Sequence, residues 1–288
     1  MLTEGSFIIL VMSDPIRSYY DQNTGIFLKF SSSRKAQNIH RSLWTDGART
    51  LEDALNVANN RILNEIVSVA PEHACILDLG CGVGASLFHI YPRLINPSYA
   101  VGLTISSLQA KHASNSEKQA NLHERIFFAQ GDFTDIPLQS PWDVAYSIEA
   151  VFHAMEPEKY FLEVGRWLRR GGKLVLIDDF QAQRPFSRKD VDWLKAFKDG
   201  WHLPGLSTVE EVKQWAGKYG LNLIKSELLT PYLRLRNLPD GLARAIRLIG
   251  NQLPIRHPIL PSMLGSMALQ QCLHEGIVEY RFLVFERV

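Results

Sequence analysis

The sequence predicts an α/β protein in which a mainly parallel β-sheet carries helices on both faces. Three observations support this fold class. Short apolar runs alternate with helical stretches between residues 74 and 178, as in sheets whose strands are joined by helical crossovers. The first run leads into a glycine-rich turn, ILDLGCGVGAS, at residues 76–86. The chain closes on a run of alternating apolar residues, which is typical of a strand with one buried face.

The elements follow in order along the chain. Pro15 after Asp14 marks a helix start, and residues 51–69 carry apolar side chains at helical spacing. Strands of the sheet are expected at residues 75–79, 99–103, 126–129, 144–148 and 173–177. Helices between them are expected at residues 84–91, 106–120 and 157–168. Each strand–helix–strand unit should be right-handed.

The pattern changes after residue 177. Ser207 with Glu210 fits a capping box that opens a helix. A strand is expected at residues 221–229, and the segment 231–273 is long, apolar and mostly helical. The last strand, 277–286, should pair antiparallel with residues 221–229. It presents four residues to one side: Val278, Tyr280, Phe282 and Val284.

These patterns divide the chain into four parts. They are an N-terminal helical segment at 1–70, a ligand-binding core at 71–230, a helical cover or subunit interface at 231–276, and the final core strand at 277–288. The core includes a cover insertion at about 179–205, so the helical cover comprises 179–205 and 231–275.

Composition excludes several classes of protein. With 288 residues, a net charge of +1, 46% apolar and 21% charged residues, the chain is typical of a soluble globular protein and not of a nucleic-acid binder. Three cysteines without a CxxC pair indicate a reducing compartment, hence a cytoplasmic location, and no zinc site. No apolar run is long enough for a transmembrane helix. The first residues, MLTEGSFIILVM, lack the basic region and cleavage site of a signal peptide, and we interpret them as a tail.

The glycine-rich turn predicts a cofactor site. A buried strand runs into Gly80, Gly82 and Gly84, where the backbone can turn tightly and approach a ligand, and a helix N-terminus follows. The spacing is degenerate, because Gly80, Gly82 and Ala85 also fit the dinucleotide fingerprint. A tight turn without a ligand is the plainer alternative.

Three neighbouring motifs separate the cofactor hypotheses. Asp78 stands two residues before the first glycine, where a carboxylate can reach an ammonium group, which the nicotinamide dinucleotides do not place there. The second strand ends in GLT at 102–104, without the acid that would hold the ribose of such a dinucleotide. Asp132 after the third strand can accept from an adenine amine, and Phe133 can pack on the ring.

With these motifs in order, the chain resembles a class I S-adenosylmethionine-dependent methyltransferase from about residue 19 to residue 177. Two runs, GLTISSLQA at 102–110 and YSIEAVFHA at 146–154, resemble the narrower group of sterol and tocopherol C-methyltransferases and cyclopropane-fatty-acid-synthase-like enzymes. The segments YYD at 19–21 and NIHRSLW at 38–44 resemble N-terminal segments of that group. The resemblance implies a Rossmann-like seven-stranded sheet, with six strands parallel and the last antiparallel, under a helical cover.

The resemblance also implies roles for particular residues. Tyr20 would close over S-adenosylmethionine, and Ser147 and Glu149 would line its methyl end. The other implied cofactor contacts are Asp78, Gly80, Cys81, Gly82 and Gly84 for the methionine part, Thr104, Ile105 and Gln109 for the ribose side, and Asp132 and Phe133 for adenine. Thr104 departs from the acid of most class I enzymes, and Gln109 would supply the ribose contact instead. Arg41 stands where a small residue is expected after the Ile-His pair.

Three residues are candidates for the chemistry itself. Glu149 and His153 follow the fourth strand four residues apart, a spacing that on a helix places both on one face at the carboxyl end of the sheet. Either can take a proton, or Glu149 can stabilise positive charge, whereas the alternative is a packing role. His40 is the third candidate, and a surface position is its alternative. No cluster has metal-ligand spacing, and we expect no metal.

Two further sets have a structural and a functional interpretation. Trp193, Phe197 and Trp201 recur every four residues, as in a core-facing helix stripe or a hydrophobic substrate wall. Five arginines between residues 231 and 260 accompany one acid, Asp240: Arg234, Arg236, Arg244, Arg247 and Arg256. They fit a solvated face, an anionic group on the substrate, or a membrane surface.

The function hypotheses come from three classes. The favoured one is a methyltransferase for a hydrophobic small molecule such as a terpenoid, a lipid or a secondary metabolite, with or without an anionic group. The alternatives are a nicotinamide-dependent oxidoreductase and a non-catalytic cofactor-binding subunit. Nucleic acid and stable membrane insertion are not expected, and a homodimer is one explanation for the 231–276 segment.

Overall fold

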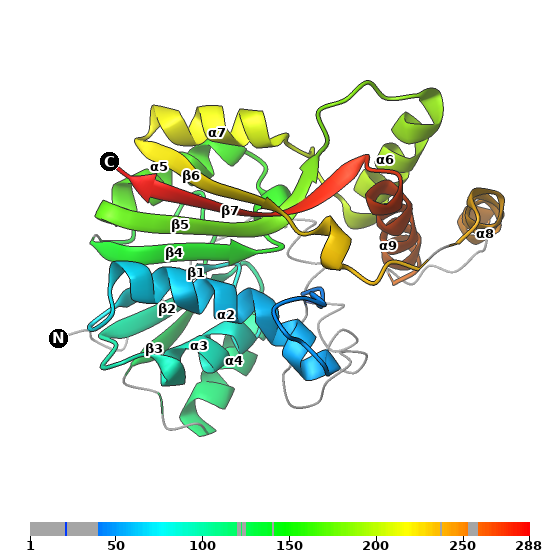
Figure 1. Cartoon of the computed structure of the whole chain (residues 1–288). Coiled ribbons are helices and arrows are strands. Elements are labelled where there is room, and N and C mark those ends of the chain that lie inside the picture. Colours follow the sequence, from blue (N-terminus) through cyan, green and yellow to red (C-terminus); the bar gives the residue numbers. More distant parts are fainter. Residues whose placement is uncertain are drawn as a thin grey trace.

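The computed structural model describes residue 21 and residues 40–119, 122, 125–139, 141–236, 238–252 and 259–288. A seven-stranded sheet forms the centre of this part of the chain, in the order β3-β2-β1-β4-β5-β7-β6 (Figure 1). The strands are β1 Cys75–Leu79, β2 Tyr99–Thr104, β3 Ile126–Gln130, β4 Trp142–Ile148, β5 Leu168–Gln181, β6 Leu221–Leu228 and β7 Val278–Arg287. The helix expected from Pro15 and the predicted cofactor contact Tyr20 lie outside the described residues.

Strand directions confirm the predicted sheet. β1 pairs in parallel with β2 and β4, β3 with β2, and β5 with β4. β7 runs antiparallel between β5 and β6, as expected for the last strand. The strand order reverses between β1 and β4, and in such sheets ligands bind at the carboxyl ends of the strands beside this point.

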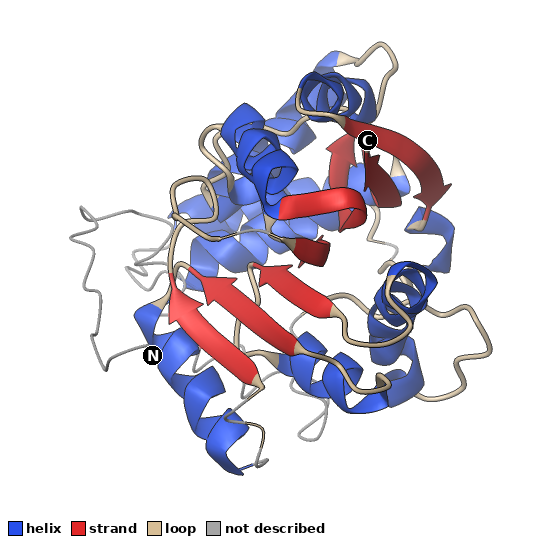
Figure 2. Ribbon diagram, turned by 90° about the vertical axis from the view of Figure 1, so that its left-hand side faces the viewer, coloured by secondary structure: helices blue, strands red, loops and turns tan. Residues whose placement is uncertain are grey.

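Helices cover both faces of the sheet (Figure 2). On one face α2 and α3 pack with apolar side chains of the sheet, and on the other face α5 and α7 do so. α2 has its predicted bounds and starts at a capping box between Thr50 and Asp53. The helices are α2 Leu51–Val69, α3 Ala85–Ile90, α4 Ser107–Gln119, α5 Pro157–Trp167, α6 Arg188–Trp201, α7 Val209–Lys218, α8 Asp240–Gln252 and α9 Ile259–His274.

The cover consists of α6, α8 and α9, which lie beyond the carboxyl ends of the parallel strands (Figure 1). This confirms that residues 231–275 are mainly helical in their described part. α6 and α9 touch at two glycines: a Cβ built at Gly200 would lie 2.5 Å from the Cα of Gly265. Glycine at both positions therefore lets the two helix backbones approach closely.

Two predicted boundaries are wrong. β5 continues to Gln181, so Asp179–Gln181 belongs to the sheet and not to the cover, because β7 pairs with β5 from Lys173 to Gln181. The capping box of α7 lies one residue later than predicted, with Thr208 and Glu211 in place of Ser207 and Glu210. Among the described helices, none combines the length and apolar composition that crossing a membrane requires.

Candidate active site

The glycine-rich turn follows β1 at the carboxyl edge of the sheet. Gly80, Gly82 and Gly84 have positive φ angles of 94°, 56° and 83°, a region that other residues rarely adopt. The N–H groups of Gly80 and Cys81 both donate to the carbonyl of Leu103, at 2.9 and 2.8 Å. These bonds fasten the turn to the end of β2.

The turn is packed on one side and open on another. A Cβ at Gly80 would lie 2.3 Å from the Cβ of Ala150, so the chain just after β4 packs directly against the turn. Apart from Gly82 itself and its two chain neighbours, no described residue has a heavy atom within 4 Å of a Cβ built at Gly82. Gly82 therefore presents bare backbone that a ligand can approach.

Asp78 lies beneath the turn, near the end of β1, and is buried. Its Oδ2 accepts a hydrogen bond from the hydroxyl of Tyr146 at 2.9 Å. Burial raises the pKa of Asp78 to about 7. Burial and the neighbouring Asp78 carboxyl group raise the pKa of the Cys81 thiol. A cation placed beside this carboxyl group would hold it ionised. The position therefore fits the predicted contact with an ammonium group.

Polar side chains where β2 ends and α4 begins form one hydrogen-bonded group. The hydroxyl of Thr104 donates to Oε1 of Gln109 at 2.7 Å, and both side chains are buried. Ile105 stands between them in the chain and is half-buried. The Ser106 hydroxyl donates to Asp21 at 2.5 Å, which brings the last residue of the YYD segment to this edge of the sheet.

Asp132 and Phe133 follow β3 on the other side of β2. Asp132 is exposed, and its Oδ1 accepts from the N–H and the hydroxyl of Thr134 at 2.8 and 2.7 Å. The Phe133 ring packs edge-on against Tyr160 at 5.2 Å, and its Cε1 lies 4.0 Å from the Cβ position of Gly80. Phe133 thus lies beside the glycine turn and Asp132 directly precedes Phe133 in the chain, and the adenine-binding role of both stays a prediction.

Ser147 and Glu149 lie in different surroundings at the end of β4. Ser147 is fully buried beside Tyr160 of α5. Glu149 has a φ of 51°, rare for a residue other than glycine, and the 3₁₀ helix Val151–His153 begins only after it. The expectation that Glu149 and His153 share one helix face is therefore wrong, because the left-handed turn at Glu149 precedes the helix.

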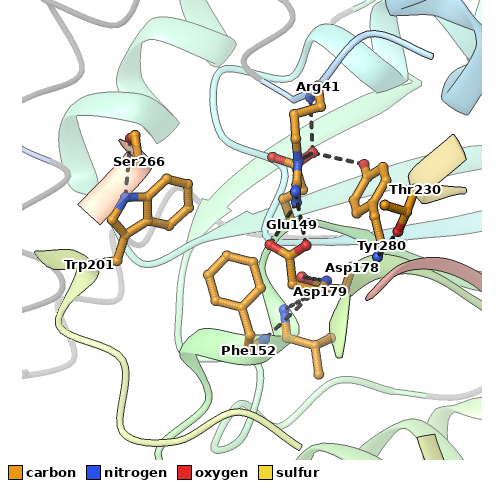
Figure 3. Close-up of polar contacts among 10 residues, drawn as sticks. Arg41, Glu149, Phe152, Asp178, Asp179, Trp201, Thr230, Ser266 and Tyr280 are labelled. Carbon is orange, nitrogen blue, oxygen red and sulfur yellow. Dashed lines mark hydrogen bonds and ion pairs between the residues drawn. The ribbon is translucent and has the colours of Figure 1, made fainter. Parts of the chain in front are cut away.

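Arg41 binds Glu149 and Asp179 at the same time (Figure 3). Its backbone N–H and Nε donate to Oε1 of Glu149 at 2.9 and 3.0 Å. Its two terminal nitrogens donate to the two oxygens of Asp179 at 2.9 and 2.8 Å. The Tyr280 hydroxyl donates to the same Oε1 of Glu149 at 2.8 Å, and its ring lies 3.9 Å from the Arg41 guanidinium. We call these four residues the Arg41 cluster.

The charges of the Arg41 cluster follow from these contacts. Burial opposes the charge of Arg41, but Asp179 and Glu149 outweigh it and raise the pKa of the guanidinium. Burial would raise the pKa of Glu149, yet Arg41 outweighs it and holds that pKa below its ordinary value. For Asp179 the effect of burial is larger than that of the ion pair with Arg41, so its pKa is raised above the ordinary value. Glu149 is therefore a carboxylate at neutral pH and a weak base.

Asp178 and Asp179 are functional candidates that the sequence analysis missed. Asp178 accepts from the N–H groups of Val151 and Phe152 at 2.9 and 3.4 Å, and from that of Asp179 at 2.8 Å. Burial and the neighbouring Asp179 raise the pKa of Asp178 well above its ordinary value. The available signal was two acids directly after a buried apolar run, at the carboxyl edge of the sheet.

Of the candidate histidines, His153 is buried, whereas His40, next to Arg41 in the chain, is half-buried. Burial, with a contribution from His202, lowers the pKa of His153 to about 3, and its ring packs on Phe152 at 4.4 Å. Burial also lowers the pKa of His40, whose Nδ1 lies 3.2 Å from the Arg41 carbonyl oxygen. His40 is partly exposed, as its alternative interpretation predicted, and both histidines are neutral at pH 7.

A pocket of about 280 Å³ adjoins the Arg41 cluster. It shares Asp179 with the cluster and lies between the loop after β4, the end of β5 and the start of α7. Most of its lining is apolar or aromatic: Val151, Phe152, Ala154, Met155, Pro157, Phe180, Pro204, Leu206, Val212 and Trp215. Such a surface suits an apolar ligand with one polar group.

The aromatic stripe and the arginines take mainly structural positions. Trp193 and Phe197 are buried in the core, as the stripe interpretation predicted. The ring centroids of Trp201 and Phe152 are 6.0 Å apart. Arg234 stacks on Trp44, Arg244 binds Asp240, and Arg247 lies over Trp193. Arg256 lies outside the described residues. In the part of the chain that the structure describes, no group of His, Cys, Asp and Glu is arranged to hold a metal ion.

Comparison with known proteins agrees with this geometry. Residues 77–176 match the model of a methyltransferase domain. The chain is 30% identical over 195 residues to 24-methylenesterol C-methyltransferase 2 of Oryza sativa subsp. japonica, covering 66% of this chain and 52% of the relative. It is 24% identical over 199 residues to 27-O-demethylrifamycin SV methyltransferase of Amycolatopsis mediterranei, covering 69% and 71%. The chain thus spans about half the length of the sterol methyltransferase.

A solved structure supports the same assignment at the level of the fold. The cyclopropane synthase MmaA2 of Mycobacterium tuberculosis aligns with a TM-score of 0.74 at 19% identity, covering 94% of this chain and 97% of the other. The chain has the fold of the class I methyltransferases, and its residues 77–176 match a methyltransferase domain. The sheet order and the antiparallel β7 are those expected for this fold class.

The residues present fit S-adenosylmethionine, which is bound in a solved structure of the same fold, a geranyl diphosphate methyltransferase. The buried Asp78 carboxyl group suits a cationic partner, Gly82 offers open backbone, and Phe133 lies beside the turn. The nicotinamide alternative lacks support, since Thr104 occupies the ribose position and binds Gln109. These contacts would hold the cofactor along the carboxyl ends of β1, β2 and β3.

Proposed function

We propose that the chain transfers the methyl group of S-adenosylmethionine to a hydrophobic small molecule, such as a terpenoid, a sterol-like lipid or a secondary metabolite. The observation that carries the acceptor class is the mostly apolar pocket beside the Arg41 cluster. Two relatives named for a sterol and for a rifamycin support the same class. A cytoplasmic location and a homodimer stay predictions.

When bound, the cofactor supplies an activated methyl group on a sulfonium. The protein has to hold the acceptor atom within about 3–3.5 Å of that carbon. Glu149 is fixed by three hydrogen bonds and stays ionised, so we assign it the stabilisation of positive charge on the donor or acceptor. Its lowered pKa makes it a poor proton acceptor.

His153 is the alternative proton acceptor for a phenol or an amine. It is neutral at pH 7 and therefore in the basic form, but its pKa of about 3 makes it weak. The proposed mechanism thus depends on orientation and electrostatics more than on proton transfer. A carbon acceptor that gains cationic character would benefit most from Glu149.

A screen with methyl-labelled S-adenosylmethionine tests the proposal. Terpenoids, sterol-like lipids, phenols and small amines are offered in parallel, and we expect label in an apolar acceptor. Cofactor binding without transfer to any acceptor would favour the non-catalytic subunit. Calorimetry with S-adenosylmethionine and with NAD separates the cofactors. The Asp78→Asn variant should bind S-adenosylmethionine more weakly. The control Asp143→Asn should bind it normally, because Asp143 stands at the start of β4, where it accepts from the Cys75 N–H at the edge of the sheet opposite the glycine turn.

A further inference from the structure

The helix α8 carries an apolar face that the described chain leaves uncovered. Its inner side is packed: Ala243 and Gly250 are buried, and a Cβ at Gly250 would lie 3.0 Å from a methyl group of Leu264 in α9. Its outer side is exposed, with Leu248 at 60% and Ile249 at 62%. Leu242 and Ile246 are exposed as well and fall on the same side at helical spacing.

Basic residues accompany this apolar face. Arg244, with a side chain 40% exposed, lies on the helix, and the exposed Arg234 and Arg236 come shortly before it. Arg247, by contrast, packs over Trp193 on the inner side. The acid of this segment, Asp240, is already bound by the Trp193 indole at 2.8 Å and by Arg244 at 3.0 Å. The surface around α8 is therefore apolar and cationic.

α8 is also the outermost element of the cover (Figure 1), standing beyond α9 and away from the sheet. A protruding amphipathic helix of this composition can lie in the interface of a bilayer, with its apolar side among the acyl chains and its arginines near anionic headgroups. We propose that α8 docks the protein on an anionic lipid surface.

A second copy of this chain fits the face less well. A symmetric dimer places the same patch on both sides of the interface. The arginines around one α8 would then face those around the other, and Asp240 is already paired. Charge complementarity therefore favours anionic lipid. The proposal concerns docking alone and does not depend on the proposed methyl transfer.

Vesicle flotation of the full chain tests the proposal, with phosphatidylcholine vesicles that contain or lack phosphatidylglycerol. We expect binding to the anionic vesicles, weakened by salt. Replacing Leu248 and Ile249 by Ser should reduce the bound fraction about tenfold or more. The matched control is Ile95→Ser, which removes an equally exposed isoleucine, at 62%, far from α8 in the fold and should leave binding unchanged.

Two outcomes would overturn the proposal. One is equal flotation of the parent and of the Leu248→Ser/Ile249→Ser variant, with both showing the same thermal midpoint. The other is that the parent protein binds neither kind of vesicle. This outcome overturns the proposal whether analytical ultracentrifugation shows self-association through α8 or a monomer. Weaker binding of an Arg236→Gln/Arg244→Gln variant to anionic vesicles alone would support the electrostatic part.

Discussion

The two halves of the carboxyl edge of the sheet are built differently. The half formed by β1, β2 and β3 uses backbone: a glycine turn, its bonds to Leu103, and side chains next to it in sequence. The half formed by β4, β5 and β7 is held together by charged side chains that pair with one another. There Arg41 reaches Glu149 over 108 positions and Asp179 over 138, and Tyr280 reaches Glu149 over 131.

The difference indicates how the two tasks are divided. A cofactor common to a family can be held by a backbone motif that tolerates variation in most side chains. The proposed acceptor side depends on a few paired charges, so one replacement there would change the surroundings of the methyl group. The predictions below test whether the two halves respond separately.

The largest effect is expected from Arg41→Ala. It leaves Glu149 and Asp179 buried without their cation and should lower the free energy of unfolding by about 3–5 kcal/mol. Urea unfolding at neutral pH measures this. Arg61→Ala is the control, because Arg61 also binds two carboxylates, Asp46 and Glu227, but these are more exposed. Its cost should be about 1 kcal/mol. Equal costs would mean that the Arg41 cluster is no more than a surface ion pair.

The cofactor half should respond to pH through Asp78. Its pKa is about 7 in the folded chain, above its unfolded value, so folding favours the protonated form. Stability is then fully present below about pH 4 and is lost as the pH rises through about 7, by up to roughly 4 kcal/mol. Asp78→Asn should remove this part of the pH dependence, as unfolding at pH values on both sides of 7 will show. A variant with the parent's pH profile would contradict the assignment.

Glu149→Gln tests the charged half without removing the side chain. We expect turnover to fall about 100-fold with cofactor affinity retained, because the variant keeps its shape but loses its charge. His153→Asn should have a smaller effect. Both are measured at saturating cofactor. Near-parental turnover in both variants would leave orientation as the main contribution of the protein.

The smallest effects are expected from two tyrosines, each of which binds a carboxylate of a different half. Tyr280→Phe removes a hydrogen bond to Glu149, and Tyr146→Phe removes one to Asp78. Each should cost about 1–2 kcal/mol. Tyr280→Phe should lower turnover by up to about tenfold, whereas Tyr146→Phe should weaken cofactor binding. If both variants changed the same parameter, the two halves would not be separable.

Much of the backbone was predictable from local pattern. The bounds of α2 and β1, the order of strands and helices, the helical nature of 231–275 and the antiparallel last strand all agree with the structure. Apolar periodicity, glycine turns and capping residues depend on residues that are close together in the sequence. The elements that they mark can therefore be recognised without tertiary information. The extension of β5 to Gln181 could not, because it depends on pairing with β7.

The sequence by itself determined the fold class and the glycine turn, and it predicted a set of residues that a cofactor would meet. Only the tertiary structure revealed the Arg41 cluster, on the side where we propose that the acceptor binds. It placed Arg41, which the sequence showed merely as a departure from a family pattern, between Glu149 and Asp179. It also turned the expected helical pair of Glu149 and His153 into a left-handed residue and a buried histidine. The reason is that a charge pairs through space: no local rule links residue 41 to residues 149 and 179 until the strands and the cover bring them together.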